Sequence, residues 1–374
     1  MASTYQLLVD GTPVEAGLYE ALGSIEVEEN AELPGAIQLN LPVNRDEAGD
    51  LAYVSDPLFK PYANLAVVVE VEDRPAECIF DGYVLSHKLH LQRGTVASTL
   101  QVWGQDASWL MNLEEKAREW VDVTDAAVAS AIFGEYGIQP APDNDADDSA
   151  THTESGHTLM QRATDIQFLR QLARRGGKLC RVVCTQQAGQ RTGYFARPDL
   201  SAEPAVVLPL NDPEQELVTA LDFEWDVSRP SEVTTRQALF QDPSEDGVSG
   251  DTADSGLEPL DERGLASFAG RPMKVMLTAS VDDAGELQQR ARALLRESGF
   301  FARCTGEVDV AALKAVLRVG TVVQIEGAGS LHSGKYLVWS VRHTLTADSH
   351  RMGFVLVRNA VGPQPSGGGG GGLF

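Results

Sequence analysis

The sequence contains few cysteines and no long apolar run. Four cysteines in 374 residues are too few to describe a disulfide scaffold, and synthesis inside the cell would keep them reduced. No apolar run approaches the roughly 20 residues that a transmembrane helix needs. The first residues, MASTYQLLVDGTPVEAG, lack the basic flank and the apolar centre of a signal peptide. We therefore expect a soluble protein that is made in the cytoplasm and does not insert stably into membranes.

Basic residues are also scarce. The chain has 30 Lys and Arg against 54 Asp and Glu, which gives a formal net charge of −24. Such a charge repels phosphate backbones instead of releasing their counterions, so it argues against nucleic-acid binding by the chain itself. The acidic residues are spread along the sequence, with concentrations at 143–148 and 242–262, which is typical of a solvated surface.

Hydrophobic residues make up 43% of the chain, enough for two or more packed units at this length. In the first hundred residues they alternate with polar residues in short bursts separated by turn residues, as in antiparallel strands. The apolar sets that share a face are Ile25 and Val27; Ile37, Leu39 and Leu41; and Leu65, Val67, Val69 and Val71. Segments 81–91 and 96–103 read as a hairpin. We predict an antiparallel barrel or sandwich over residues 1–105.

The pattern changes near residue 106. Segments 106–120 and 124–136 carry apolar residues at helical spacing, and Thr124 is a predicted N-cap. These helices open a region, residues 106–200, that we predict to be helical and α+β.

The clearest helix of this region begins after Thr164. Thr164 and Gln167 have the spacing of a capping box, and Gly176-Gly177 is the expected end. The strand-like segments KLCRVVC and GYFARP follow.

Strand patterns return over residues 201–361. They are interrupted by a Gly-, Ser- and Asp-rich acidic stretch at 241–264, which we predict to be a mobile loop, and by a predicted helix at 284–298. Residues 362–374 have the composition of a flexible glycine-rich tether.

An ungapped comparison that places Val84 on Val338 aligns similar residues. The aligned pairs are Ser86 with Ser340, Lys88 with Arg342, Leu91 with Leu345, and Leu100–Trp103 with Phe354–Val357. Any two amphipathic hairpins share a period of two, so this match alone does not establish a repeat. As a hypothesis, it indicates that the chain contains two related barrels.

No catalytic signature is found in the sequence, which lacks G-x-S-x-G, H-E-x-x-H and G-x-x-x-x-G-K-[ST]. His87 and His90 lie three apart in a strand-like segment, hence on opposite faces, which favours surface or packing roles over metal binding. Cys180 and Cys184 share a strand face but lie roughly 13 Å apart, too far for a disulfide or one zinc ion.

The best metal candidate is the segment DNDADDSATHTE. Its acidic residues Asp143, Asp145, Asp147 and Glu154 occupy positions 1, 3, 5 and 12 of a calcium-loop template. Position 6 should be glycine and carries Asp148, and prolines just upstream interrupt an entering helix. A solvated acidic loop is the favoured interpretation. We assign no catalytic, cofactor-binding or metal-ligating residue, and we expect no cofactor.

Segment 161–182, QRATDIQFLRQLARRGGKLCRV, resembles a segment of the phage late control D and VgrG-like baseplate hub family. Thr164 stands where that family often has Ser, and Asp165 matches its acid. The hydrophobic frame of the family is matched by Phe168, Leu169, Leu172, Ala173 and Gly177. Segments 79–91 and 98–120 resemble the family's barrel hairpin and the short helix after it. Segment 319–361 resembles its closing stretch, including the final Arg358-Asn359.

The resemblance implies a β-rich α+β fold with two tail-tube-like antiparallel β-barrels, at 1–105 and 201–361, around an intervening helical region. It implies a structural, non-enzymatic baseplate hub of a contractile phage tail or contractile injection system. A homotrimer of such chains presents six similar barrels and adapts the six-fold tail tube to the three-fold spike.

The same resemblance implies the partners. Because the chain ends in a glycine tether and lacks the spike domains of larger family members, the spike is expected to be a separate protein. Tail tube and baseplate proteins are the other expected partners, and the assembled tail or injection particle is the final location. A type VI-like secreted hub is the nearest alternative within this class.

A different class of protein is an extracellular enzyme or carbohydrate-binding module built on β-domains. That class would need a secretion signal, which the sequence does not show, and an aromatic-lined acidic cleft. Only 7% of the residues are aromatic. The cleft itself cannot be judged from sequence, and the hub implied by the resemblance is the favoured interpretation.

Overall fold

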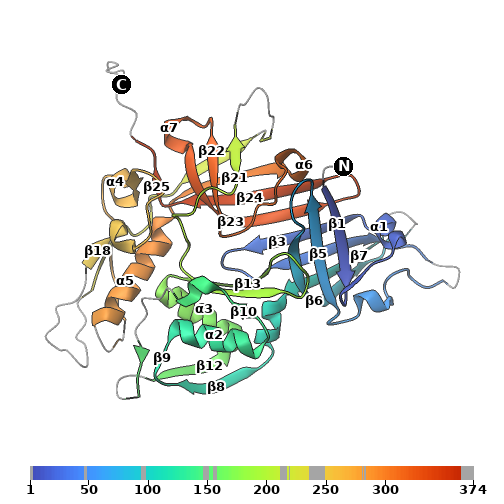
Figure 1. Ribbon diagram of the computed structural model, residues 1–374, viewed down its shortest axis with the longest axis horizontal. Coiled ribbons are helices and arrows are strands. Elements are labelled where there is room, and N and C mark those ends of the chain that lie inside the picture. Colours follow the sequence, from blue (N-terminus) through green and yellow to red (C-terminus); the bar gives the residue numbers. More distant parts are fainter. Residues whose placement is uncertain are drawn as a thin grey trace.

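The computed structural model describes residues 3–45, 49–93, 98–145, 151–154, 158–210, 217–218, 220–235, 249–279, 281 and 284–363. A large β-sheet dominates these residues, with a helical region on one side and a smaller lobe at one end (Figure 1). No helix within the described residues combines the length and the apolar character needed to cross a bilayer.

The first part of the sheet confirms the strands predicted from alternation. Inward residues of β3 and β4, such as Ile25 and Ile37, are almost fully buried, while their neighbours are half-exposed. A two-residue turn at Asp10-Gly11, with both φ angles positive, joins the first two strands. The strands are β1 Ser3–Val9, β2 Thr12–Pro13, β3 Ser24–Asn30, β4 Ala36–Pro42, β5 Asn64–Val71, β6 Glu77–His90 and β7 Thr99–Asp106.

The second part of the sheet repeats the strand order of the first. Its strands are β15 Val207–Pro209, β16 Leu221–Trp225, β21 Ala302–Asp309, β22 Val322–Glu326, β23 Gly334–Leu345 and β24 His350–Arg358. In the first part the spatial order is β3-β4-β7-β6-β5-β1, and in the second it is β16-β21-β24-β23-β22-β15. When the strands of each part are ranked by their position along the chain, the two spatial orders are the same. The two outermost pairs differ, because β1 is antiparallel to β5 whereas β15 is parallel to β22.

The central hairpins of the two parts share a β-bulge. The register shifts between Val84 and Ser86 in β6, and between Val338 and Ser340 in β23. These are the residues that the sequence comparison aligned. A bulge inserts one extra residue and bends the strand at that point. Its recurrence at the aligned position is therefore a specific similarity of the two hairpins.

The register corrects the alignment of the second strand of each hairpin. Trp103 faces Ser86 and Val355 faces Ser340, so Trp103 corresponds to Val355 and not to Val357. The difference of two residues arises in the turn, which is shorter between β23 and β24. A shift of two keeps every side chain on its face, which is why an ungapped comparison still found matching residues.

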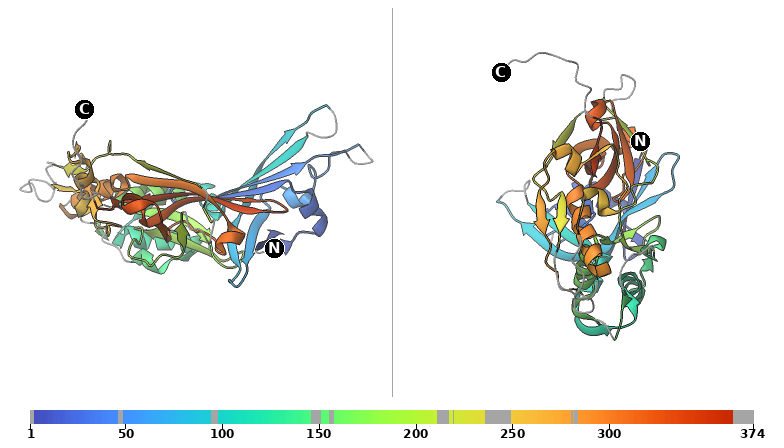
Figure 2. Two further views of the ribbon diagram at one scale, coloured as in Figure 1. Left: turned by 90° about the horizontal axis from the view of Figure 1, so that it is seen from above. Right: turned by 90° about the vertical axis from the view of Figure 1, so that its left-hand side faces the viewer.

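The two parts join through β3, the edge strand of the first part, which pairs with the second half of β23 from Ser340 to Leu345, beyond the residues that pair with β22. One apolar core lies under both parts and includes Val27 of β3 and Val341 of β23. Among the described strands the order is linear with one branch, so neither part is closed by hydrogen bonds into the expected barrel. The far ends of β6 and β7 project from one end of the molecule (Figure 2).

The middle region packs helices against short strands. Residues 107–112 are a 3₁₀ helix, and 115–120 form strand β8 where we predicted helix. Tertiary pairing decides this, because β8 is hydrogen-bonded to β12 along its whole length and buries Trp120. The elements are η2 Ala107–Asn112, β8 Glu115–Trp120, β9 Val123–Thr124, α2 Asp125–Glu135, β10 Gln139–Pro140, η3 Pro142–Asp145, β11 Thr151–His152, β12 Leu159–Thr164, α3 Asp165–Gly176, β13 Leu179–Cys184 and β14 Arg191–Ala196.

The helix ends match the predicted signals in part. Thr124 caps α2 by accepting from Ala127 N at 3.2 Å, as predicted. Gly177 ends α3 in the left-handed conformation, with φ 63°. The predicted capping box of α3 does not form, because the side chains of Thr164 and Gln167 both donate to Asn112 instead.

The lobe contains α5, which confirms the predicted helix at 284–298. Of the predicted mobile loop at 241–264, residues 249–264 contain β18, η4 and β19, whereas 241–248 lie outside the described residues. The lobe elements are β17 Glu232–Thr234, β18 Ser249–Asp251, η4 Thr252–Ser255, β19 Arg263–Gly264, α4 Leu265–Ala269, β20 Lys274–Met276 and α5 Ala284–Gly299. The remaining short elements are α1 Ala16–Ala21, η1 Pro57–Phe59, α6 Val310–Leu313, α7 Gly329–His332 and β25 Ala360–Val361.

Candidate functional site

The candidate residues considered for metal binding are not brought together. His87 and His90 are both exposed on the projecting part of β6. Asp143 is exposed in η3, Glu154 lies in a separate turn, and Asp147 is outside the described residues. No group of three His, Cys, Asp or Glu side chains within the described residues is placed to hold a metal ion.

The residues of the family-like segment 161–182 have a structural role in the middle region. Asp165, at the start of α3, is fully buried. Its two oxygens accept from Gln161 Nε2 at 2.6 Å, Lys116 Nζ at 2.6 Å and Tyr136 OH at 2.7 Å. Gln161 in turn accepts from Trp120 Nε1 at 3.1 Å. One carboxylate therefore ties α3 to β12, β8 and α2.

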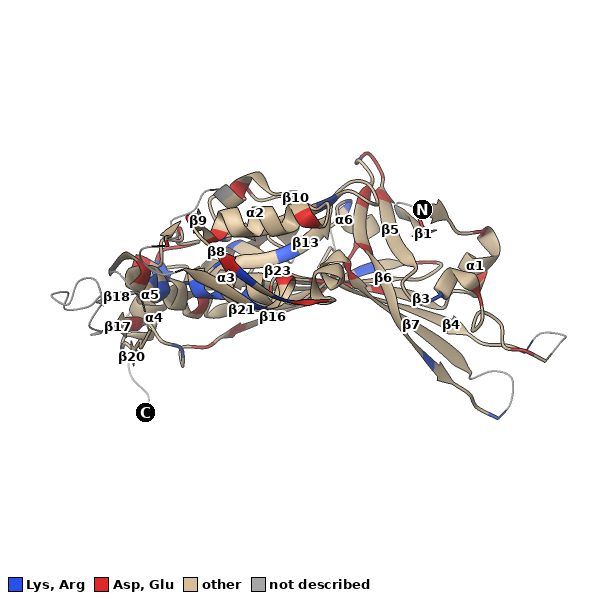
Figure 3. Ribbon diagram, turned by 90° about the horizontal axis from the view of Figure 1, so that it is seen from below, with Lys and Arg blue, Asp and Glu red and all other residues tan. Residues whose placement is uncertain are grey.

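The charge of Asp165 is stabilised by these partners. Burial alone would raise the pKa of this carboxyl, but the hydrogen bonds from Lys116, Tyr136 and Gln161 lower it overall. The hydrogen bond to Asp165 in turn raises the pKa of Lys116. Burial and the same carboxylate raise the pKa of Tyr136 to about 12. Figure 3 shows Lys and Arg residues on β8 and α3 close to acidic residues.

The Arg358-Asn359 pair, at the end of β24, holds the lobe against the sheet. Arg358 is fully buried, and its Nη2 forms an ion pair with Asp261. Asn359 accepts from Leu260 N and donates to Glu258 O, each at 2.9 Å. These contacts hold residues 258–261, within the stretch predicted to be mobile, against the end of β24.

Arg318 joins three parts of the chain. It lies just before β22, and only 17% of its side chain is exposed. Its Nη2 lies 2.6 Å from Oε1 of Glu29 in β3 and donates to Cys184 O of β13 at 2.9 Å. Its Nη1 donates to Cys78 O of β6 at 3.2 Å and to Glu77 at 3.3 Å. A single guanidinium thus connects both parts of the sheet with the middle region, and we call this set of contacts the Arg318 joint.

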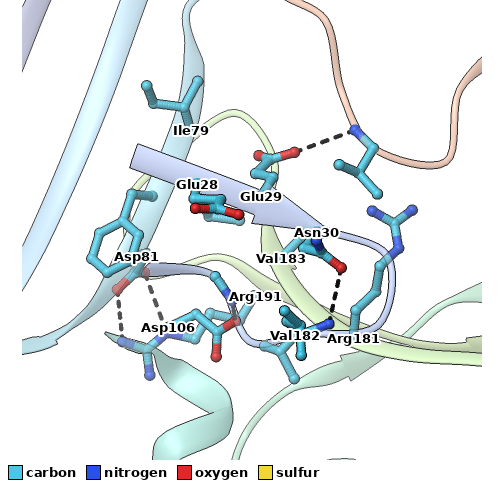
Figure 4. A pocket seen from close by; sticks show the side chains of 15 residues that line it. Glu28, Glu29, Asn30, Ile79, Asp81, Asp106, Arg181, Val182, Val183 and Arg191 are labelled. Carbon is cyan, nitrogen blue, oxygen red and sulfur yellow. Dashed lines mark hydrogen bonds and ion pairs between the residues drawn. The ribbon is translucent and has the colours of Figure 1, made fainter. Parts of the chain in front are cut away.

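Asp81 forms a second contact between β6 and the middle region. Arg191 of β14 binds it with Nη2 at 2.8 Å and Nε at 3.2 Å, a bidentate arrangement. Gly189 N and Asn64 Nδ2 donate to the same carboxylate at 2.7 and 2.8 Å. Burial would raise the pKa of Asp81, but these donors, Arg191 first, lower it overall. Figure 4 shows Asp81 and Arg191 facing each other across the junction.

The cavity between these residues is small. It has a volume of about 30 Å³, which is room for about one water molecule, and Glu29, Asp81 and Arg191 line it (Figure 4). An open cleft of about 410 Å³ lies beside it and is lined by Arg181, Cys184 and Arg318. The charged groups here bind one another across boundaries between parts of the chain. This arrangement suits holding those parts in fixed positions.

Sequence reasoning missed two buried pairs. Cys184 Sγ donates to Cys78 O at 2.9 Å across 106 residues of sequence. His343 Nδ1 lies 3.0 Å from His350 Nε2, with both rings buried between β23 and β24. The histidine pair could have been predicted, because a hairpin of β23 and β24 places these two positions close together. The cysteine pair left no local signal.

A comparison with protein families matches residues 1–347 to the model described as the Alg8 N-terminal domain. The chain belongs to this family. The description names a domain and no activity, so membership of the Alg8 N-terminal domain family leaves the function to be inferred from the structure. No curated protein matches the sequence.

Solved structures of tail proteins have a fold similar to that of this Alg8 N-terminal domain chain. The 43 kDa tail protein of prophage MuSo2 from Shewanella oneidensis aligns with a TM-score of 0.66 at 15% identity, covering 96% of this chain and 99% of that one. A tail protein from Neisseria meningitidis MC58 aligns with a TM-score of 0.62 at 13% identity, covering 97% and 98%.

A third structure with a similar fold is that of a secretion-system protein. It is an E. coli protein described as a component of the type VI secretion system, with structural similarity to T4 bacteriophage tail proteins. It aligns with a TM-score of 0.54 at 13% identity, covering 96% of this chain and 79% of that one. At these identities the likeness establishes a common fold for almost the whole chain.

Proposed function

We propose that the chain is a structural baseplate hub of a contractile phage tail or contractile injection system. It acts as a homotrimer that adapts the six-fold tail tube to the three-fold spike, and it is not an enzyme. Its partners are a separate spike protein below and the tail tube and baseplate proteins around it. After cytoplasmic synthesis it becomes part of the assembled particle.

The observation that carries this proposal is the repeated strand order of the sheet. The order β3-β4-β7-β6-β5-β1 recurs as β16-β21-β24-β23-β22-β15, and the central hairpin of each part has the same bulge. Two similar units per chain become six in a trimer, which is the number a six-fold tube requires. One chain with a duplicated unit can therefore match three-fold and six-fold partners at once.

We keep the boundaries predicted from the sequence for this division. Residues 1–105 supply the first tube-like barrel, 106–200 the intervening region and 201–361 the second barrel, with closure of each barrel proposed to occur in the assembled ring. Neighbouring subunits can complete such a ring, because β16 has a single hydrogen-bonded neighbour and its other edge is unpaired among the described strands.

The Arg318 joint supports a mechanical role. A hub must keep its two tube-like units at a fixed angle, since a change in that angle would destroy the six-fold match. Arg318, Asp81 and Arg358 each connect separate parts of the chain through buried ionic contacts. The likeness to tail proteins along almost the whole chain supports the same conclusion.

Absolute mass by light scattering tests the proposal. The purified full chain is measured alone and then with the spike protein encoded beside it, and an unrelated acidic protein serves as the control partner. We expect a mass near three times 40.3 kDa and a further increase with the spike alone. A monomer that binds neither spike nor tube protein, under conditions where the chain is folded, would overturn the hub.

A further inference from the structure

Cys78 and Cys184 are adjacent in the fold although 106 residues separate them. Cys78 N donates to Thr185 O at 2.9 Å, and Cys184 Sγ donates to Cys78 O at 2.9 Å. The Cys78 thiol itself donates to Phe80 O at 3.2 Å. Both residues are buried, in a small cluster with Ala66. Two buried cysteines on backbone segments that hydrogen-bond to each other are the kind of pair between which a disulfide can form.

The Arg318 joint fixes the backbone at both cysteines. Arg318 donates to Cys78 O at 3.2 Å and to Cys184 O at 2.9 Å, so the two peptide groups are held by the same guanidinium. Because the joint holds both backbone segments in place, bond formation between the sulfurs has to proceed by rotation of the two side chains. The other two cysteines, Cys180 and Cys304, are buried in separate apolar clusters.

We propose that Cys78 and Cys184 are a redox modification site, at which a low-molecular-weight disulfide oxidises the two thiols to one disulfide bond. The bond joins β6 of the sheet covalently to β13 of the middle region. In a reducing cytoplasm the thiols stay free, and the bond forms when the chain meets an oxidising exterior. That last clause alone rests on the proposed function, since a tail or injection particle is what leaves the cell.

The reaction balances as two thiol–disulfide exchanges. The Cys184 thiolate attacks one sulfur of the small disulfide, which breaks its S–S bond, forms a mixed disulfide and releases one small thiol. The Cys78 thiolate then attacks Cys184 Sγ, forms the Cys78–Cys184 bond and expels the second small thiol. The protein loses two electrons and two protons, and the oxidant gains them as two thiols.

Access and protonation set the rate of this reaction. Cys184 is buried but belongs to the lining of the open cleft of about 410 Å³ beside the joint, and we take this cleft as the route by which a small disulfide approaches it. Burial and the neighbouring Cys78 hold the pKa of the Cys184 thiol well above its ordinary value, and the thiolate is therefore rare at neutral pH. Oxidation should be slow near pH 7 and faster as the pH rises.

Peptide mapping of the native full chain tests the proposal. The protein is incubated with hydroxyethyl disulfide at pH 7 and at pH 8.5, quenched with acid, denatured, alkylated and digested for mass spectrometry. We expect a cross-linked peptide pair containing Cys78 and Cys184, while Cys180 and Cys304 are recovered alkylated. The intact protein should lose the mass of two hydrogen atoms, and the yield should rise at the higher pH.

Variants and an unfolded sample make the result specific. C180S should form the same cross-link as the parent chain, whereas C184S should leave Cys78 fully alkylatable. The same treatment in guanidinium should give a mixture of pairings, which shows that the fold selects the pair. Recovery of four free cysteines from the native chain, a stable mixed disulfide at Cys184, or a bond to Cys180 or Cys304 would each overturn the site. None of these readouts depends on trimer formation, so failure of the hub proposal would be seen separately.

Discussion

Arg318 Nη2 lies 2.6 Å from Glu29 Oε1, although the two residues belong to opposite ends of the sequence. Glu29 also accepts from Val319 N at 3.3 Å, so the carboxylate binds both the side chain and the following peptide group. Burial opposes the charge of Arg318, but Glu29 and the neighbouring acids hold its pKa above the ordinary value. The pair places the first part of the sheet against the second at the level of β13.

Replacing Arg318 with Met should destabilise the chain strongly. The change leaves Glu29 buried without its cation and removes donors from Cys78 O and Cys184 O, and breaking a buried pair in this way costs about 3–5 kcal/mol. Thermal unfolding at pH 7 measures the effect. The matched control is Arg351→Met, because its partner Glu307 lies at 2.9 Å but both side chains are more than half exposed. We expect at most about 1 kcal/mol there, and equal effects of the two variants would contradict a central role for Arg318.

Replacing Asp165 with Asn should destabilise the middle region in a pH-dependent manner. The folded-state pKa of Asp165 is lowered, so its ionised form contributes stability above the unfolded value of about 3.9, and this contribution is lost as the pH falls through the folded value. D165N should therefore be less stable than the parent at pH 7, by about 3 kcal/mol, and the difference should shrink below pH 4. Unfolding midpoints across pH 3–7 check this. A difference independent of pH would mean that geometry and not charge is responsible.

The local elements of this chain could be predicted from its sequence where one periodicity dominates. The alternation of Ile37, Leu39 and Leu41 and the helical frame that ends at Gly177 both have the expected structures. Segment 115–120 was predicted as helix and is a strand, because its hydrogen-bonded partner, β12, lies some forty residues later in the chain. Long-range pairing outweighed local spacing there.

The candidate site was harder to predict, because its contacts join distant segments. Asp165 and Arg358 stand out in the sequence only through the family resemblance. Their roles as buried ionic contacts depend on Lys116 and Asp261, which nothing in the local sequence identifies. Arg318 carried no signal at all. Its importance comes from the meeting of β3, β6 and β13, which only the three-dimensional structure reveals.

The buried histidine pair should make stability depend on pH between about 4 and 6.5. Burial lowers the pKa of His350 to about 4, and burial, His350 and Arg318 lower that of His343 well below 6.5; Asp309 opposes the shift of His350. In this window the unfolded chain binds more protons than the folded chain, so stability falls as the pH drops from 6.5 towards 4. For His350 alone the loss approaches about 3 kcal/mol.

A double variant, His343→Leu with His350→Leu, should flatten this pH dependence. His343 Nε2 and His350 Nδ1 are buried and have no hydrogen-bond partner within the described part of the chain, so apolar replacement should cost little stability at pH 7. Unfolding midpoints from pH 4 to pH 7 provide the comparison, with H87Q on the exposed part of β6 as the control. If the double variant keeps the slope of the parent chain, other groups cause the acid sensitivity.

The contacts of Arg358 and Asn359 predict that the segment 258–261 can be released from the sheet by mutation. Asn359→Ala removes the acceptor of Leu260 N and the donor to Glu258 O, each at 2.9 Å, without leaving a buried charge. We expect faster amide hydrogen exchange at 258–261, by roughly a factor of 10 for each 1.4 kcal/mol of lost local stability, with β24 itself still protected. Asn40→Ala, on β4 of the first part, is the control and should leave 258–261 unchanged. Unchanged exchange at 258–261 in N359A would show that the apolar contacts of Leu260 are sufficient to hold the segment, and would assign the order of this stretch to packing.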